Sequence, residues 1–202
     1  MKSIKINTLL FYEVHAKDFF SSTVDVEFSD IQERFLELLP DHASVLDFGC
    51  GSGRDTKYFL EKGYVVSATD GSEELCQLAS EYTGISVRHE YFEQLDEEEV
   101  YDGIWACSSI LHVKKKDLPD ILCRMARAIK DNGIIYTSFK YGDFEGERNG
   151  RYFSDFTEES FTRLLEQIPC LKIQDLFMTG DVRPGRGDEK WLNLILRKQN
   201  IH

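Results

Sequence analysis

Three glycines, Gly49, Gly51 and Gly53, stand at alternate positions directly after the apolar run Val45–Phe48. Glycine adopts positive φ angles and lets the backbone come very close to a ligand. A helical pattern begins at about residues 52–56, and the free N–H groups at the start of a helix favour a nucleotide-type cofactor. The spacing therefore predicts a strand, a ligand-binding loop and a helix, and it indicates a cofactor site.

The spacing of the glycines also bears on which cofactor is bound. A dinucleotide fingerprint has the pattern G-x-G-x-x-G, in which the third glycine lets the helix pack tightly over the pyrophosphate. Here the pattern is G-x-G-x-G, and Arg54 occupies the position of that third glycine. A nicotinamide-dependent oxidoreductase is thus an alternative against which Arg54 argues.

Further residues around this loop carry a resemblance to a known family. Asp47 inside the strand, the glycine loop, and Asp70 at the end of a second strand pattern resemble motifs I and II of the class I S-adenosylmethionine (SAM) dependent methyltransferases. Tyr101–Val113 is similar to the fourth strand and Leu-His pair of small-molecule members, and Asn132–Phe139 is similar to the fifth strand. The resemblance implies SAM as cofactor, S-adenosylhomocysteine (SAH) as product, and methyl transfer as activity.

The same resemblance implies roles for individual cofactor residues. Asp70 would accept hydrogen bonds from the ribose hydroxyls, and Tyr12, in a Tyr-x-x-x-Ala start, would reach the methionine carboxylate; packing at the core edge is the alternative for Tyr12. Tyr91 or Phe92 replaces the acid that the family places near adenine, so we expect backbone groups and Phe92 to recognise that ring. The predicted cofactor residues are Tyr12, Asp47, Gly49, Cys50, Gly51, Gly53, Arg54, Asp70, Gly71, Tyr91, Phe92, Ala106 and Cys107.

The acceptor site is predicted from a histidine and from arginines in two glycine-containing segments, 141–151 and 180–190. His112 is the candidate base, because imidazole titrates near neutral pH; anchoring the turn by hydrogen bonds is the alternative. Arginines in an acidic chain suggest a carboxylate or phosphate on the acceptor, unless they pair with the acids nearby, which include Asp181. The predicted substrate-binding residues are His112, Tyr141, Arg148, Arg151, Arg183, Arg186 and Trp191.

Composition narrows the class of partner. The chain has 36 acidic and 24 basic residues and a net charge of -12, which argues against nucleic-acid substrates and anionic membranes. The five cysteines form no C-x-x-C pair, so we expect reduced, buried thiols and no metal. Without a signal-peptide core or a long apolar run, we expect a cytoplasmic monomer or homodimer that acts on a small-molecule acceptor. A SAM-binding sensor or partner subunit without turnover is a further alternative.

Alternating strand and helix patterns define the elements that must position these residues. They predict an α/β fold in one domain, 1–202, with an N-terminal helical cap over 1–40 and a Rossmann-like core over 41–202. The core is expected to be a doubly wound, mostly parallel sheet of seven strands. The resemblance adds the strand order 3-2-1-4-5-7-6, with the last strand antiparallel. Ser29–Gln32 predicts a capping box, and Tyr141–Arg151, with three glycines and no apolar period, predicts a mobile loop.

Overall fold

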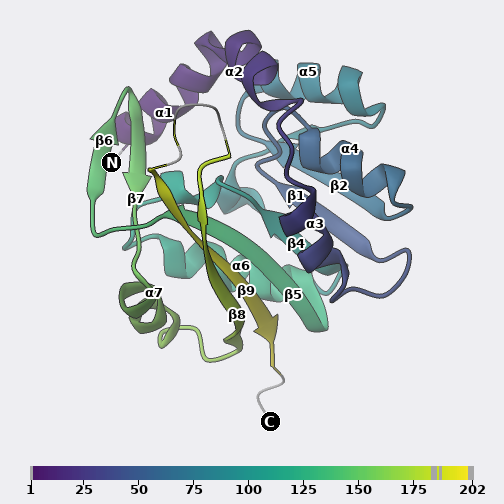
Figure 1. Ribbon diagram of the computed structural model, residues 1–202, viewed down its shortest axis with the longest axis vertical. Coiled ribbons are helices and arrows are strands. Elements are labelled where there is room, and N and C mark those ends of the chain that lie inside the picture. Colours follow the sequence, from purple (N-terminus) through teal and green to yellow (C-terminus); the bar gives the residue numbers. More distant parts are fainter. Residues whose placement is uncertain (1, 183–185, 187, 200–202) are drawn as a thin grey trace.

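A seven-stranded sheet lies at the centre of the computed structural model, which describes residues 2–182, 186 and 188–199 (Figure 1). The elements in chain order are α1 (Lys2–Val14), α2 (Ala16–Thr23), α3 (Ser29–Leu36), β1 (Ser44–Phe48), α4 (Arg54–Glu61), β2 (Val65–Asp70), α5 (Glu73–Thr83), β3 (Arg88–His89), η1 (Phe92–Gln94), β4 (Tyr101–Ala106), η2 (Ile110–His112), α6 (Leu118–Ala128), β5 (Ile129–Lys140), β6 (Glu145–Arg148), β7 (Arg151–Ser154), α7 (Glu158–Leu165), β8 (Leu171–Gly180) and β9 (Lys190–Lys198). The sheet order is β3-β2-β1-β4-β5-β9-β8, and β9 runs antiparallel to both of its neighbours. The predicted fold class, strand order and antiparallel last strand are confirmed.

Helices cover both faces of the sheet. Alternate residues of each strand point to opposite sides, and the apolar side chains on each side pack against helices. On one side, Trp105 and Tyr136 pack with Phe35 of α3 and Phe59 of α4. The Trp105 and Tyr136 rings are stacked, with centroids 4.0 Å apart. Helix α5 packs on the same side, against Ala68 of β2. Helices α6 and α7 cover the opposite side.

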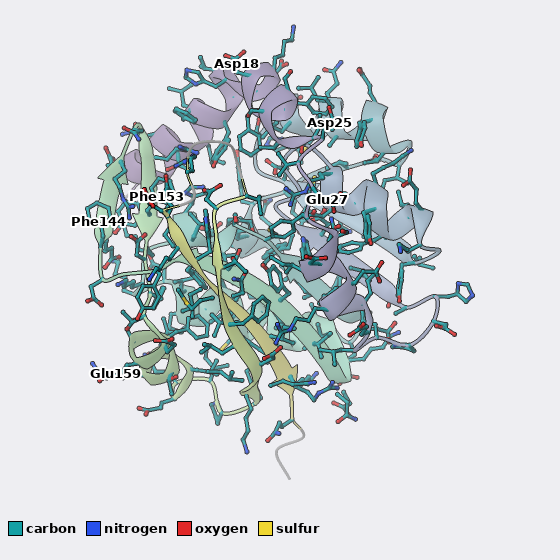
Figure 2. All side chains as sticks on the ribbon, in the orientation of Figure 1. Asp18, Asp25, Glu27, Phe144, Phe153 and Glu159 are labelled. Atoms are coloured by element: carbon teal, nitrogen blue, oxygen red, sulfur yellow. The ribbon has the colours of Figure 1, made fainter. Side chains whose placement is uncertain are left out.

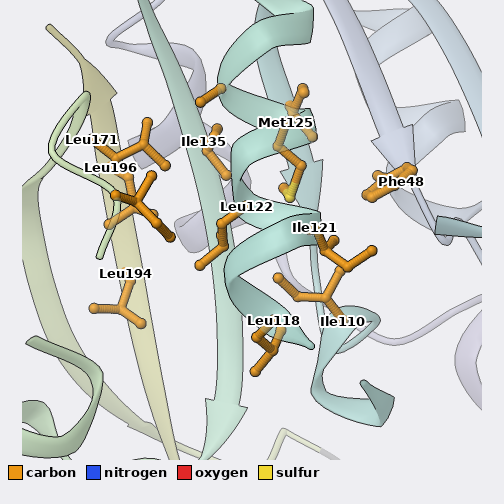
Figure 3. Packing of buried hydrophobic residues seen from close by; sticks show 14 of the residues in the cluster. Phe48, Ile110, Leu118, Ile121, Leu122, Met125, Ile135, Leu171, Leu194 and Leu196 are labelled. Carbon is orange, nitrogen blue, oxygen red and sulfur yellow. The ribbon is translucent and has the colours of Figure 1, made fainter. Parts of the chain in front are cut away.

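Helix α6 is anchored by apolar side chains at helical spacing. Leu118, Ile121, Leu122 and Met125 are all buried, and Figure 3 shows them gathered with Leu194 of β9 in one apolar layer. Burying a side chain of this size contributes about 1.5 to 3 kcal/mol. The cluster therefore fixes α6 and, with it, the short 3₁₀ helix η2 that precedes α6 at the carboxyl end of β4.

Side chains cap two of the helices. Ser72 accepts a hydrogen bond from the Leu75 N–H over 3.2 Å, and Thr157 caps α7. The capping box predicted at Ser29 is wrong, because the helix already includes Ser29 and its N-cap residue is Phe28. The Ser29 N–H instead donates to Oε1 of Glu27 over 2.8 Å.

A β-hairpin, β6–β7, occupies the segment predicted as a loop, so that prediction is wrong. Asn149 and Gly150 connect the strands with φ angles of 50° and 77°. A two-residue turn with positive φ at both positions matches the twist of a hairpin, and Asn-Gly is its preferred sequence. The hairpin stands beside α1 (Figure 1), and a Cβ on Gly150 would lie 3.2 Å from Cδ2 of Phe11.

Two further findings concern the expectations from composition. All five cysteines are free, but the predicted burial holds only for Cys76, because Cys123 is exposed and the other three are half-buried. Among residues 2–182, 186 and 188–199, no helix has the length and apolar character that crossing a bilayer requires.

Candidate active site

A cavity of about 990 Å³ lies beyond the carboxyl ends of β1, β2, β4 and β5. This volume is at the upper end of the range for ligand pockets, about 300 to 1,000 Å³. The glycine loop and Asp70 line one part of it, and the β6–β7 hairpin and the β8–β9 ends line another. The predicted site residues that line the cavity are Tyr12, Gly49, Cys50, Gly51, Arg54, Asp70, Gly71, Tyr91, Phe92, Cys107, His112, Arg148, Arg151, Arg186 and Trp191.

Two residues of motif I lie beneath the loop and do not line the cavity. Asp47 is 2% exposed and accepts a hydrogen bond from Oγ1 of Thr56 over 2.6 Å. Burial, helped by a neighbouring carboxylate, raises the pKa of Asp47 to about 8. Gly53 precedes α4 with a φ of 77°, and a Cβ there would lie 2.8 Å from Cγ2 of Thr83. Asp47 and Gly53 therefore support the conformation of the loop without lining the cavity.

Two more predicted residues also lie outside the cavity. Ala106 is fully buried at the end of β4. Tyr141 is exposed, and its hydroxyl donates to Oε2 of Glu158 over 3.3 Å. Arg183 falls outside the described residues.

Asp70 holds the glycine loop in place while its carboxylate lines the cavity. Its Oδ2 accepts from the Gly51 N–H over 2.8 Å, and its Oδ1 accepts from the Ser72 N–H over 2.9 Å. Burial raises the pKa of Asp70, which these N–H donors oppose. The geometry fixes both the loop and the direction of the carboxylate.

The loop itself has no room for side chains at two of its glycines. A Cβ on Gly49 would lie 2.6 Å from Cβ of Ser109, and a Cβ on Gly51 would lie 2.9 Å from Cε1 of Phe19. The Ser109 hydroxyl also lines the cavity, is buried, and has no hydrogen-bond partner among the described residues. An unsatisfied buried hydroxyl costs free energy, so a ligand that bonds to it would be favoured.

Arg54 is held at the cavity wall by a fully bonded carboxylate. Asp55 accepts from Gln32 over 2.6 Å, from Trp105 over 2.8 Å, and from Arg54 over 2.7 and 3.0 Å. Burial alone would lower the pKa of Arg54. The Asp55 carboxylate outweighs this effect and raises the pKa above its ordinary value, so the guanidinium stays charged. The guanidinium also lies over the ring of Phe28, 4.5 Å from its centroid.

Tyr12 and His112 are hydrogen-bonded to each other. The His112 Nδ1 lies 2.6 Å from the carbonyl oxygen of Tyr152, and its Nε2 lies 2.8 Å from the Tyr12 hydroxyl oxygen. Because a carbonyl only accepts, Nδ1 carries the proton and Nε2 accepts from the Tyr12 hydroxyl. Burial, together with the charge of Arg151, lowers the pKa of His112 to about 4. His112 is therefore neutral near pH 7, and the lone pair that a base would use is occupied.

Two of the predicted arginines already have carboxylate partners. Arg148 pairs with the buried Asp155. Arg186 pairs with Glu189 over 2.6 Å and lies 3.8 Å from Asp181. Pairing with nearby acids, including Asp181, is the alternative to anion binding that the sequence leaves open. Arg186 follows that alternative.

The sequence reasoning passed over several residues that line the cavity. Glu90 lies directly before Tyr91, and burial raises the pKa of its carboxyl group. Lys114 and Lys116 follow His112 in a run of three lysines, a basic cluster that stands out in an acidic chain. Phe153 also lines the cavity, in the strand after the Asn-Gly turn. Recognition of that turn as a hairpin signal would have placed Phe153 on a strand. In the described part of the chain, no group of three or more His, Cys, Asp or Glu residues could hold a metal ion.

Comparisons with known proteins agree with this geometry. A family model described as a methyltransferase domain matches residues 45–133. An uncharacterized methyltransferase of Staphylococcus carnosus is 27% identical over 170 residues, which are 77% of this chain and 82% of that protein. The crystal structure of Burkholderia thailandensis 1,6-didemethyltoxoflavin-N1-methyltransferase with bound 1,6-didemethyltoxoflavin and SAH has a TM-score of 0.72 and 26% identity, covering 95% of this chain and 85% of that one.

The fold is also shared at lower identity. The N-methyltransferase NodS of Bradyrhizobium japonicum, in complex with SAH, has a TM-score of 0.75 and 17% identity, covering 96% of this chain and 100% of that one. The glycine loop, the Asp70 carboxylate in the cavity and the seven-stranded sheet occur together in the order that the family requires. The family match over residues 45–133, the related methyltransferase and the SAH-bound structure together support a class I S-adenosylmethionine-dependent methyltransferase.

Proposed function

We propose that this methyltransferase transfers the SAM methyl group to an oxygen, nitrogen or sulfur atom of a small-molecule acceptor. The observation that carries the proposal is that one cavity joins the glycine loop and Asp70 to the arginines and aromatic rings of the hairpin. An in-line displacement needs both reactants aligned in one site, and a shared cavity brings them together. The similarity to an N1-methyltransferase makes a nitrogen acceptor the first to test.

The proposed cofactor site is the part of the cavity at the glycine loop. Asp70 would accept from the ribose hydroxyls, and Gly49 and Gly51 would leave room for the methionine portion. Tyr91 and Phe92 would flank the adenine. The bound cofactor supplies an activated methyl group, so these residues need only bind and orient it. The unsatisfied hydroxyl of Ser109, next to Gly49, supports a polar ligand group at this place.

His112 is proposed to position Tyr12 rather than to accept a proton from the acceptor. Its low pKa and the hydrogen bond to Nε2 both make it a weak proton acceptor. A neutral amine attacks the methyl carbon with its own lone pair as the carbon–sulfur bond breaks, and its proton can then leave to solvent. No base is required for such an acceptor.

The test combines binding with turnover. Calorimetry with SAM, SAH and NAD should show binding of the first two alone; NAD binding without SAM binding would overturn the proposal. A panel of small amines, thiols and hydroxyl compounds, assayed for SAH release, should then give turnover that depends on the acceptor. SAM binding without turnover on any acceptor would favour the sensor or partner-subunit alternative. A cytoplasmic location and a monomeric or homodimeric state stay as predictions.

A further inference from the structure

Two arginines face each other across the hairpin turn. The register of β6 and β7 pairs Arg148 with Arg151 on either side of the Asn149 and Gly150 turn. Residues directly opposite on antiparallel strands share one face of the hairpin, and both arginines line the cavity. Like charges in this arrangement destabilise a hairpin, so the pair needs negative charge nearby.

The structure provides that negative charge for one arginine. Asp155, which is 5% exposed, pairs with Arg148. Arg151 forms no ion pair within the described part of the chain. Its Nη1 donates to the Tyr12 hydroxyl oxygen over 3.3 Å, and its Nε is buried without a hydrogen-bond partner among the described residues. Of the two arginines, only Arg148 therefore has a carboxylate partner among the described residues.

Aromatic rings surround the guanidinium of Arg151. Its Cζ lies 4.6 Å from the ring centroid of Phe11, 5.7 Å from that of Tyr12 and 5.3 Å from that of Phe153. Figure 2 shows Phe153 on the hairpin, and its side chain also lines the cavity. Packing against rings occupies the flat faces of a guanidinium and leaves its in-plane N–H groups for a planar anion.

Two lysines also line the cavity, and Asp117 and Asp120 line it beside them. Lys114 and Lys116 line it, and neither forms an ion pair within the described part of the chain. Lys114 lies over the ring of Tyr152, the neighbour of Arg151, with its Nζ 5.9 Å from the centroid.

We infer that Arg151, supported by Arg148 and Lys114, binds a carboxylate or phosphate group of the methyl acceptor, so that the acceptor is a small anion. The inference rests on the proposed function and adds the chemical class of the substrate. It keeps the anion-binding role that the sequence suggested for Arg151 and withdraws it from Arg186, because Arg186 already has carboxylate partners.

The test compares charged and neutral probes of similar shape. Benzoate, phenyl phosphate and benzamide are titrated into the SAH-loaded protein, with affinities measured by calorimetry at low and high salt. At least one anion should bind about tenfold more tightly than benzamide, and the preference should shrink as salt rises. The stronger of benzoate and phenyl phosphate distinguishes a carboxylate from a phosphate site.

Variants locate the preference. Arg151→Gln should remove it while the affinities for benzamide and SAH stay unchanged, which also shows that the variant is folded. Arg151→Lys keeps the charge but loses the planar fork, so it should keep part of the preference. Arg163→Gln is the matched control, because Arg163 is exposed on α7, pairs with Glu159 and does not line the cavity.

The outcomes separate this inference from the proposed function. Loss of any charge preference in the wild-type protein, including failure of both anions to bind, would overturn the inference, as would an undiminished preference in Arg151→Gln. Normal SAH binding alongside such a result leaves the proposed function standing. Absence of SAH binding in the wild type would overturn the proposed function itself.

Discussion

The hydroxyl of Tyr12 in α1 donates to Nε2 of His112, the last residue of η2, over 2.8 Å. The hydrogen bond joins the N-terminal helical segment to the turn after β4. The sequence left two roles open for each residue, cofactor binding or packing for Tyr12 and proton transfer or anchoring of the turn for His112. The structure bonds the two side chains to each other. Both proposed roles must therefore be tested with this bond in mind.

The first prediction concerns the pH dependence of stability. Folding lowers the pKa of His112 from its ordinary 6.5 to about 4, so the unfolded chain binds more protons between these values. This contribution to the free energy of unfolding is fully present above pH 6.5 and is lost as the pH falls toward 4. It amounts to no more than about 3 kcal/mol, because part of the side chain is exposed.

Urea unfolding between pH 4 and 8 measures the effect. The variant His112→Gln can still donate to the Tyr152 carbonyl, and its stability should fall less steeply with acid than that of the wild type. His42→Gln, at an exposed histidine, is the control and should keep the wild-type slope. Parallel curves for wild type and His112→Gln would show that His112 titrates normally.

The second prediction concerns the cofactor. Asp70→Asn replaces a charged acceptor with an amide of similar shape, whose single oxygen can accept from only one of the Gly51 and Ser72 N–H groups. Loss of a charged acceptor should weaken SAH binding by about 1.5 to 3 kcal/mol, roughly ten- to a hundredfold. Calorimetry measures this, with the exposed acid Glu73→Gln as control. Unchanged SAH affinity in Asp70→Asn would mean that the cofactor binds elsewhere.

The sheet and the glycine loop were predictable because their signals are local. Alternating apolar runs, helical periods and the three glycines each fix the backbone within a few residues, and one resemblance orders the strands. The hairpin carried an equally local signal in Asn149 and Gly150, which the absence of an apolar period hid. β6 has no buried residue and β7 is buried at three consecutive positions, so neither strand shows a clear alternation of apolar and polar residues.

The partners of the charged and polar site residues could not be predicted in this way. Arg148 pairs with Asp155 rather than with an acid named in advance, and Tyr12 bonds to a residue 100 positions away. Such pairings depend on which strand ends and helices the fold brings together. A sequence pattern predicts which face of a helix or strand a residue occupies. Which faces of different elements lie close together depends on the tertiary structure.

The third prediction concerns the turn of the hairpin. Gly150 has a φ of 77° and Phe11 stands 3.2 Å from where a Cβ would be, so Gly150→Ala adds both backbone strain and crowding. The strain alone should cost about 1 to 2 kcal/mol of stability. Gly84→Ala is the matched control, because Gly84 has a φ of 80° and open space around it.

Both variants should lose stability in urea, and Gly150→Ala alone should also weaken anion binding, because it displaces the hairpin that carries Arg151. SAH affinity should stay near the wild-type value in both. Equal anion binding in the two variants would show that the hairpin does not contribute to the acceptor site.

The last prediction concerns the charge balance at the tip of the hairpin. Asp155→Asn keeps the shape of a side chain that is 5% exposed but removes the carboxylate that neutralises Arg148. Stability should fall, because a half-buried guanidinium loses its charged partner. Binding of benzoate or phenyl phosphate should instead rise by about three- to tenfold at low salt, because the hairpin gains one unit of positive charge facing the cavity.

These opposite directions distinguish an anion receptor from a structural ion pair, whose loss would weaken folding and binding together. Asp175→Asn makes the same charge change at a surface pair with Arg34, away from the cavity, and should leave the preference for anions unchanged. Calorimetry at two salt concentrations on the three proteins decides the matter. If Asp155→Asn binds both anions no more tightly than the wild type, the charge of the hairpin does not act on the acceptor.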